Sequence, residues 1–234
     1  MGQENYPVAE NLADYFDSIG IVNPARRKEA YALMRLDLKA AAAVTAWENR
    51  TKYFPFLYGG TETTKRFSQK DVLYPPNDNP ILDLGGGFIS VSELKVGVTP
   101  ATPAGTVLTE GTDFFLRAKN APNKRKPYTW LEFYRSFFPV TLYGSDYPDS
   151  IRITGKEGYW TTVEDDAWDA ILKYGAYLSY QELALAVSKG RYSVRDLNYE
   201  VRYAGANASP LKLEADGWKA NFDSTAKQYR RIEL

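Results

Sequence analysis

The sequence predicts an α+β protein, in which a bundle of long helices carries a β-rich insertion and an extended C-terminal arm that ends in a helix. Two observations carry this prediction. Apolar residues recur at three- and four-residue spacing in two long segments, which is typical of amphipathic helices. Between these segments, short alternating runs are separated by Gly, Pro and Asn, which is typical of strands and turns.

These patterns divide the chain into four segments of one structural domain with appendages. They are an N-terminal arm and long helix (1–54), a β-rich insertion (55–160), a long central helix (161–190) and a C-terminal arm and helix (191–234). The 234 residues are enough to build one sizeable core.

The N-terminal segment predicts a short helix over residues 11–19, followed by a long one. Asn23 is expected to cap the long helix, because Pro24 suits a first helical turn. Its apolar stripe recurs at three- and four-residue spacing from Leu33 to Trp47, and Pro55 ends the helix. The four alanines at 40–43 either permit close approach of another helix or simply reflect helix propensity.

The insertion predicts six short strands between turn-rich loops. They span residues 61–68, 81–84, 88–96, 113–118, 128–134 and 151–154. The three glycines at 85–87 favour a bulge or tight connection over a phosphate loop, because Phe88 and Ile89 follow where a Walker loop needs Lys and Ser or Thr. The basic loop 119–126 is interpreted as a solvated hairpin tip rather than a contact for DNA or an acidic partner.

A second long helix is expected to begin near Val163 and to stop at Gly190. Thr161 or Thr162 can offer a capping hydroxyl to its free amides. Three acidic residues favour the positive end of its dipole: Glu164, Asp165 and Asp166. Three apolar residues are expected to face the core: Trp168, Ile171 and Leu172.

The remaining chain predicts an arm and a final helix. Alternating apolar residues over 197–203 are typical of an extended segment. Ser209 and Pro210 can open the helix, but Gly217 would weaken its middle and favours a start at Trp218. Trp218, Phe222 and Tyr229 fall on one face of this helix.

Composition excludes several kinds of reaction centre. The absence of His and Cys rules out Ser-His-Asp triads, imidazole zinc sites and thiolate chemistry. The acidic group at 164–169 could supply paired carboxylates or hard metal ligands, but the helix dipole already explains its first three members. We therefore expect a protein that is not an enzyme and has no catalytic residue, cofactor or metal.

Net charge and hydropathy limit the partners and the location that we expect for this protein. Lys plus Arg and Asp plus Glu both total 29, so nothing favours nucleic acid or an anionic membrane globally. The N-terminus lacks the pattern of a signal peptide, and no apolar run reaches the ~18 residues of a membrane span. We expect a soluble protein that is not exported by a standard signal.

The order of the motifs adds a resemblance to a known family. Along the chain stand AAAVTAWENRTKY, TKRFS, ILDLGGGFISVSELKVG, GTDFFLRAKNAPNKRKPYTWLEFY, IRITGKEGYWTTVEDDAWDAILKYGAYL and QYRRIEL. In this order they resemble the phage head-to-tail connector, or adaptor, family, over about residues 30–234. The resemblance is architectural, since no motif in it is catalytic.

The resemblance implies a homo-oligomeric ring, commonly of twelve subunits, that binds beneath the portal protein and continues the DNA channel towards a downstream tail or stopper protein. DNA would pass without specific binding, and the protein would lie in the neck of a virion assembled in the host cytoplasm. The C-terminal segment would reach the portal, which makes interface candidates of Trp218, Phe222, Tyr229, Arg230 and Arg231. Self-packing of a terminal helix is the alternative for these residues. This chain is longer than the small helical members, because of its β insertion.

Two other functions remain open from the sequence. The 18 Tyr, 5 Trp and 11 Phe, together with the β-rich insertion, allow a carbohydrate- or receptor-binding module. A hydrolase that uses Asp165 and Asp166 is the third possibility, and it predicts that activity is lost when Asn replaces them.

Overall fold

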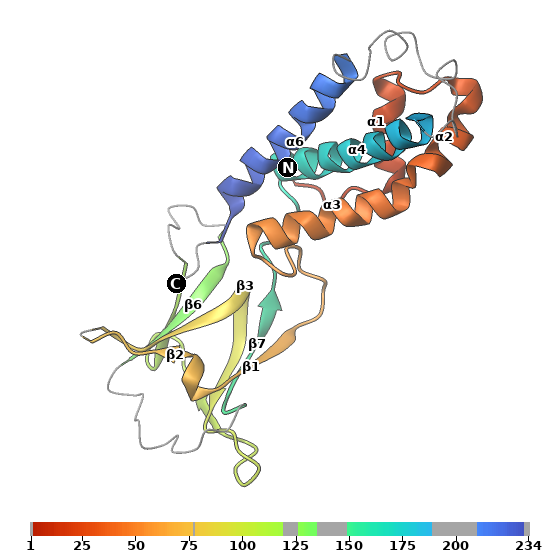
Figure 1. Cartoon of the computed structure of the whole chain (residues 1–234). Helices are drawn as coiled ribbons and strands as arrows, with labels where there is room; N and C mark the ends of the chain where they lie inside the picture. The colour runs from red at the N-terminus through yellow and green to blue at the C-terminus, as the bar shows by residue number, and fades with distance from the viewer. Residues whose placement is uncertain (1, 77, 119–125, 135–148, 189–209, 232–234) are drawn as a thin grey trace. The chain divides into compact units, whose positions relative to one another are not determined.

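The computed structural model describes residues 2–76, 78–118, 126–134, 149–188 and 210–231, and it confirms the α+β class. The chain divides into two compact units (Figure 1). The helical unit contains residues 1–51 and 163–230, and the β unit contains residues 52–162 and 231–234. These divisions lie close to the predicted boundaries at 54 and 160, while the partition into four segments stays a prediction.

The helical unit is built from both ends of the chain. Its elements are α1 (Ala9–Ser18), the short 3-10 helix η1 (Pro24–Arg26), α2 (Arg27–Met34), α3 (Leu36–Thr51), α4 (Asp165–Ser188) and α6 (Pro210–Tyr229). Helix α4 is central, because it packs against each of the other α-helices described here: α1, α2, α3 and α6. The Asn23 cap is confirmed, since its Oδ1 accepts a hydrogen bond of 3.0 Å from the Ala25 amide.

The prediction of one uninterrupted N-terminal helix is wrong at Arg35. This residue has left-handed backbone angles (φ 54°, ψ 53°) and ends α2, while Leu36 begins α3 at once. Its amide still donates to the Tyr31 carbonyl at 3.1 Å, which closes the last turn of α2. Glycine usually takes this conformation, so neither residue type nor spacing indicated the break.

Close packing of α3 against α4 confirms that the alanine run permits close approach. Ala40 and Ala43 are buried, whereas Ala41 and Ala42 are exposed. A Cβ added to Gly175 of α4 would lie 3.7 Å from Ala43 Cβ and 3.1 Å from a methyl group of Leu12 in α1. Small residues at the crossing therefore bring three helices together.

Two helix starts differ from the predictions. Helix α4 begins at Asp165 rather than near Val163, because the backbone of Val163 exchanges two hydrogen bonds of 2.7 Å with Gln3. Helix α6 begins at Pro210 rather than at Trp218, so the helix runs through Gly217. Ile171 and Leu172 are buried and Trp168 is half-buried against the core, as predicted.

In the residues that the structure describes, the β unit forms a seven-stranded antiparallel sheet. Its strands are β1 (Thr63–Phe67), β2 (Val72–Leu73), β3 (Ile81–Val96), β4 (Thr106–Leu108), β5 (Phe114–Arg117), β6 (Tyr128–Phe133) and β7 (Ile151–Glu157). The order is β1-β7-β3-β6-β5, and both β2 and β4 pair with β3. A short 3-10 helix, η2 (Gln69–Asp71), connects β1 to β2.

Two predicted strands form the single strand β3, which passes through the three glycines. The register against β6 shifts between Asp83 and Phe88, so the predicted bulge is present but does not end the strand. Gly85 has φ 62°, and its amide donates to Asp83 Oδ1 at 2.8 Å. Gly155 of β7 lets the strands approach, because an added Cβ would lie 2.2 Å from the Ser90 carbonyl oxygen of β3.

Some predictions fall outside the described residues. They are the extended segment at 197–203, the helix stop at Gly190 and most of the basic loop at 119–126. Among the helices that the structure describes, none has the length and apolar character needed to cross a bilayer.

Candidate interaction site on the C-terminal helix

Helix α6 carries most of the predicted interface residues, and its aromatic side chains are buried within the helical unit. Phe222 stacks on Tyr174 of α4 with ring centroids 4.1 Å apart, and it meets the Trp47 ring of α3 edge-on at 5.7 Å. Trp218 meets Tyr15 of α1 edge-on at 5.7 Å. Such contacts add to the free energy gained by removing the rings from water. They therefore hold α6 against its own chain.

Tyr229 connects the end of α6 to the start of α4. Its hydroxyl group lies 2.7 Å from Glu164 Oε2 and 2.6 Å from Asp166 Oδ1, and a phenol has one hydrogen, which the two carboxylates share. Burial raises the pKa of Tyr229, and the hydrogen bonds to Asp166 and Glu164 raise it further. The acidic residues at the start of α4 thus accept a side-chain hydrogen bond as well as favouring the helix dipole.

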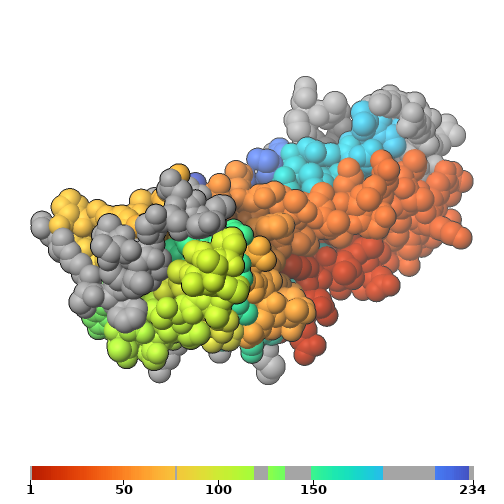
Figure 2. All heavy atoms as spheres, turned by 90° about the horizontal axis from the view of Figure 1, so that it is seen from below, coloured from red at the N-terminus to blue at the C-terminus, as the bar shows by residue number. Residues whose placement is uncertain are grey.

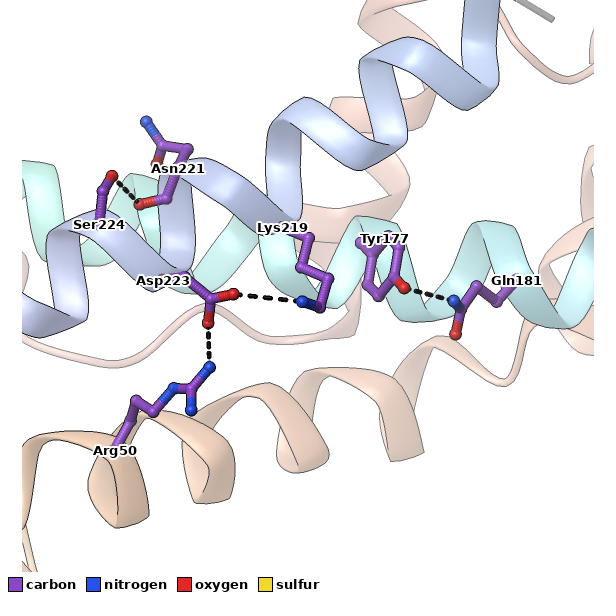
Figure 3. Close-up of polar contacts among 7 residues, drawn as sticks. All are labelled: Arg50, Tyr177, Gln181, Lys219, Asn221, Asp223 and Ser224. Carbon is purple, nitrogen blue, oxygen red and sulfur yellow. Dashed lines mark hydrogen bonds and ion pairs between the residues drawn. The ribbon is translucent and has the colours of Figure 1, made fainter. Parts of the chain in front are cut away.

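A polar network joins α6 to α3 on the surface of the helical unit (Figure 3). Asp223 accepts from Arg50 and forms an ion pair of 3.2 Å with Lys219 one turn earlier. The hydrogen bond from Arg50 lowers the pKa of Asp223 most, and the one from Lys219 adds to the shift. Because these side chains are partly exposed, the network orients α6 more than it stabilises the fold.

The two terminal arginines have different surroundings. Arg230 is exposed. Arg231 belongs to the β unit, where it is buried and forms an ion pair with Asp83 of β3. Asp83 also accepts from the Gly85 amide, so the ion pair lies at the bulge.

The five predicted interface residues are therefore not gathered on one surface. Trp218, Phe222 and Tyr229 are buried in the helical unit, Arg231 is buried in the β unit, and Arg230 alone of the five is exposed to solvent. Self-packing accounts for the three aromatic residues in the single chain. Their role at a portal interface stays a prediction.

Other kinds of site have little support among the described residues. In that part of the chain, no group of three or more carboxylate side chains is placed to hold a metal ion. Asp166 is engaged by Tyr229 and by the Ala167 amide, which donates at 2.8 Å. Sequence reasoning missed the Arg50–Asp223 pair, because the two residues are far apart in the chain and only the α3–α6 contact brings them together.

Comparison with known proteins gives two structural likenesses. No protein-family model matches the sequence, and no curated protein matches it. One similar chain is from the neck of an empty GTA particle computed with C6 symmetry, with 16% identity, coverage of 100% of this chain and 97% of that chain, and a TM-score of 0.44. Another is from the virion of a native gene transfer agent (GTA) particle, with the same identity and coverage and a TM-score of 0.40. Likenesses at this level assign neither a family nor a function.

Proposed function

We propose that this protein is a structural head-to-tail connector (adaptor) subunit, which forms a ring beneath a phage portal and extends the DNA channel towards the tail. The order of the sequence motifs carries the proposal, since six segments along the chain resemble that family in sequence order. The first helical motif lies mainly on α3 and the fifth on β7 and α4. The particle parts from which the two similar chains come agree with this role, but the proposal does not depend on them.

The architecture of the helical unit suits a ring subunit. A closed ring requires two different lateral surfaces on each copy, related by rotation. Three long helices, α3, α4 and α6, pack together through buried aromatic and small side chains, which makes a rigid body that can present such surfaces. Residues of α2 and α3 form much of the surface of the helical unit in one view (Figure 2, orange).

For the portal contact, burial changes the role that we propose for the C-terminal residues. The buried rings of Trp218, Phe222 and Tyr229 fix the position of α6, and the exposed Arg230 is the residue that touches the portal. A downstream tail or stopper protein would contact the opposite end of the ring, and DNA would pass through it without sequence-specific binding. Assembly into the virion neck would take place in the host cytoplasm.

Electron microscopy of the full-length protein, alone and mixed with its portal protein, tests the proposal. We expect rings of uniform diameter, commonly of twelve subunits, that bind to one end of the portal. A protein that stays monomeric and does not bind the portal would contradict it. A glycan-binding screen separates the alternative function, because a carbohydrate-binding module would bind there and a neck subunit would not.

A pair of variants tests the portal contact itself. Arg230→Glu is expected to weaken portal binding at least about tenfold, because it reverses a charge at the contact. Lys28→Glu makes the same charge change at an exposed position of α2 and should leave portal binding unchanged. Equal binding of both variants and the wild type would remove Arg230 from the interface.

A further inference from the structure

Three cationic side chains stand side by side across three neighbouring strands of the β unit. Arg152 of β7 is paired directly with Arg66 of β1 on one side and with Lys95 of β3 on the other. Directly paired residues point to the same face of a sheet, and neighbouring strands lie about 4.8 Å apart. We call these three residues the cationic row.

Among the described residues, none supplies a counter-charge to the central member of the row. Arg66 forms an ion pair with Asp149 at 3.2 Å, and Lys95 forms one with Glu93 at 2.7 Å. Arg152 makes no ion pair or side-chain hydrogen bond in the described part of the chain, and its Nε atom is shielded from solvent without a hydrogen-bond acceptor. Like charges directly opposite each other destabilise a sheet, so the row carries a cost that the residues described by the structure do not relieve at its centre.

The row lies on the face of the sheet opposite its hydrophobic core. The neighbours of Arg152 along β7, Ile151 and Ile153, point into that core and are at most 1% exposed. Arg152 itself is half-buried, and Val107 of β4, which is paired with Lys95, is 57% exposed. The row is thus continued beyond Lys95 by an exposed apolar side chain, and a mixture of Arg and exposed apolar residues is typical of protein interfaces.

The charges around the row favour a protein carboxylate over a nucleic acid. Asp149 and Glu93 flank the row, because they form ion pairs with Arg66 and Lys95. A nucleic acid places a phosphate at every nucleotide and would be repelled by these two carboxylates. A single carboxylate, which forms a bidentate pair with Arg152, would avoid them.

The helical unit carries an acidic surface that matches this requirement. Glu10 and Asp14 are exposed one turn apart on α1, and neither has an ion-pair partner in the described part of the chain. The last turn of α1 also has no basic residue to offset its dipole. Figure 2 shows this N-terminal region (red) at the surface of the helical unit. Like charges at this spacing destabilise a helix, so a cation from outside would relieve them.

We propose that the cationic row of one copy binds the acidic surface of α1 in a second copy, with a carboxylate of Glu10 or Asp14 paired to Arg152. The contact joins two different surfaces of the same chain, so it is heterologous and can propagate around a ring. This inference rests on the proposed function, since it names the lateral contact of the proposed ring.

Measuring the oligomeric state of full-length variants tests the contact, by analytical ultracentrifugation at low and high salt. Arg152→Glu should weaken self-association at least about tenfold, and Arg152→Gln should weaken it less, because only the first variant places a charge that repels α1. The double variant Glu10→Lys/Asp14→Lys should weaken it similarly. Combining that pair with Arg152→Glu should restore association, because the charges are exchanged. Lys227→Glu, which is exposed on α6, is the charge-matched control.

The outcomes separate this inference from the proposed function. Wild-type protein that stays monomeric both alone and with the portal would overturn both. If rings persist in Arg152→Glu, or if the exchanged charges do not restore them, this contact is wrong. The proposed function as a ring subunit would still stand. Duplex DNA binding by the wild type that Arg152→Glu abolishes, with assembly unchanged, would assign the row to DNA instead. Thermal unfolding by circular dichroism should show that every variant is folded.

Discussion

Replacing Phe222 with alanine is expected to lower the free energy of unfolding of the helical unit by about 4 kcal/mol. Buried Phe→Ala changes cost roughly 3–5 kcal/mol, because they lose the burial of the ring and leave a cavity. Phe222 is 2% exposed and contacts two other rings, Tyr174 and Trp47, and each such pair adds about 0.5–1.5 kcal/mol beyond burial. The expected loss therefore lies in the upper half of that range.

Urea unfolding followed by circular dichroism measures this effect. Phe222→Leu keeps most of the volume and should cost only about 1–2 kcal/mol, while Asn221→Ala at the exposed neighbouring position should change stability by less than about 0.5 kcal/mol. A loss below about 1.5 kcal/mol for Phe222→Ala would refute the packing of α6 on α3 and α4. The same variant should then be assayed for portal binding, because a loosened α6 would no longer hold Arg230 in place.

Four further substitutions test separate features. Tyr229→Phe removes the hydroxyl shared by the carboxylates of Glu164 and Asp166, at the start of α4, and should cost about 1–2 kcal/mol in urea unfolding. The pKa of Asp223 is lowered in the folded chain. Its ionised form therefore stabilises the fold above the unfolded pKa of about 3.9, and this stabilisation is lost as the pH falls through the folded pKa. Asp223→Asn should remove this pH-dependent part of the free energy of unfolding, which urea unfolding at a series of acidic pH values measures. Gly155→Ala should destabilise the β unit by about 3 kcal/mol or more in thermal unfolding, because the new methyl group would overlap the Ser90 carbonyl. Gly217→Ala should instead stabilise the helical unit by about 0.5–1 kcal/mol, because the added Cβ would lie in open space on α6 and alanine favours a helix over glycine.

The helices could be predicted where a single periodic pattern decides them. The apolar stripe of α4 and the cap at Asn23 follow from local residue preferences, and both agree with the structure. The break at Arg35 could not be predicted in this way, because an arginine in left-handed conformation is stabilised by its surroundings rather than by its own preference. Val163 likewise leaves the helix because of a pairing with Gln3, far away in the sequence.

The candidate sites also depend on contacts between distant segments, which local sequence patterns do not reveal. Spacing placed Trp218, Phe222 and Tyr229 on one face, but spacing does not tell whether the covering partner is another helix of the chain or another protein. The cationic row was hidden for a different reason. Arg66, Lys95 and Arg152 become neighbours only through strand register, and register depends on pairing between distant segments.

The helical unit is built from two segments that are far apart in the sequence, and this constrains the order in which the chain can fold during synthesis. Helices α1 to α3 emerge first, but the central helix α4 that covers them follows only after residue 162. The sheet, by contrast, receives its last strand, β7, at Glu157. Because domains tend to fold as units while the chain emerges, the β unit can close its sheet while the first helices still lack their partners. The helical unit is completed only when α6 has emerged, so its packed surfaces form after the sheet of the β unit.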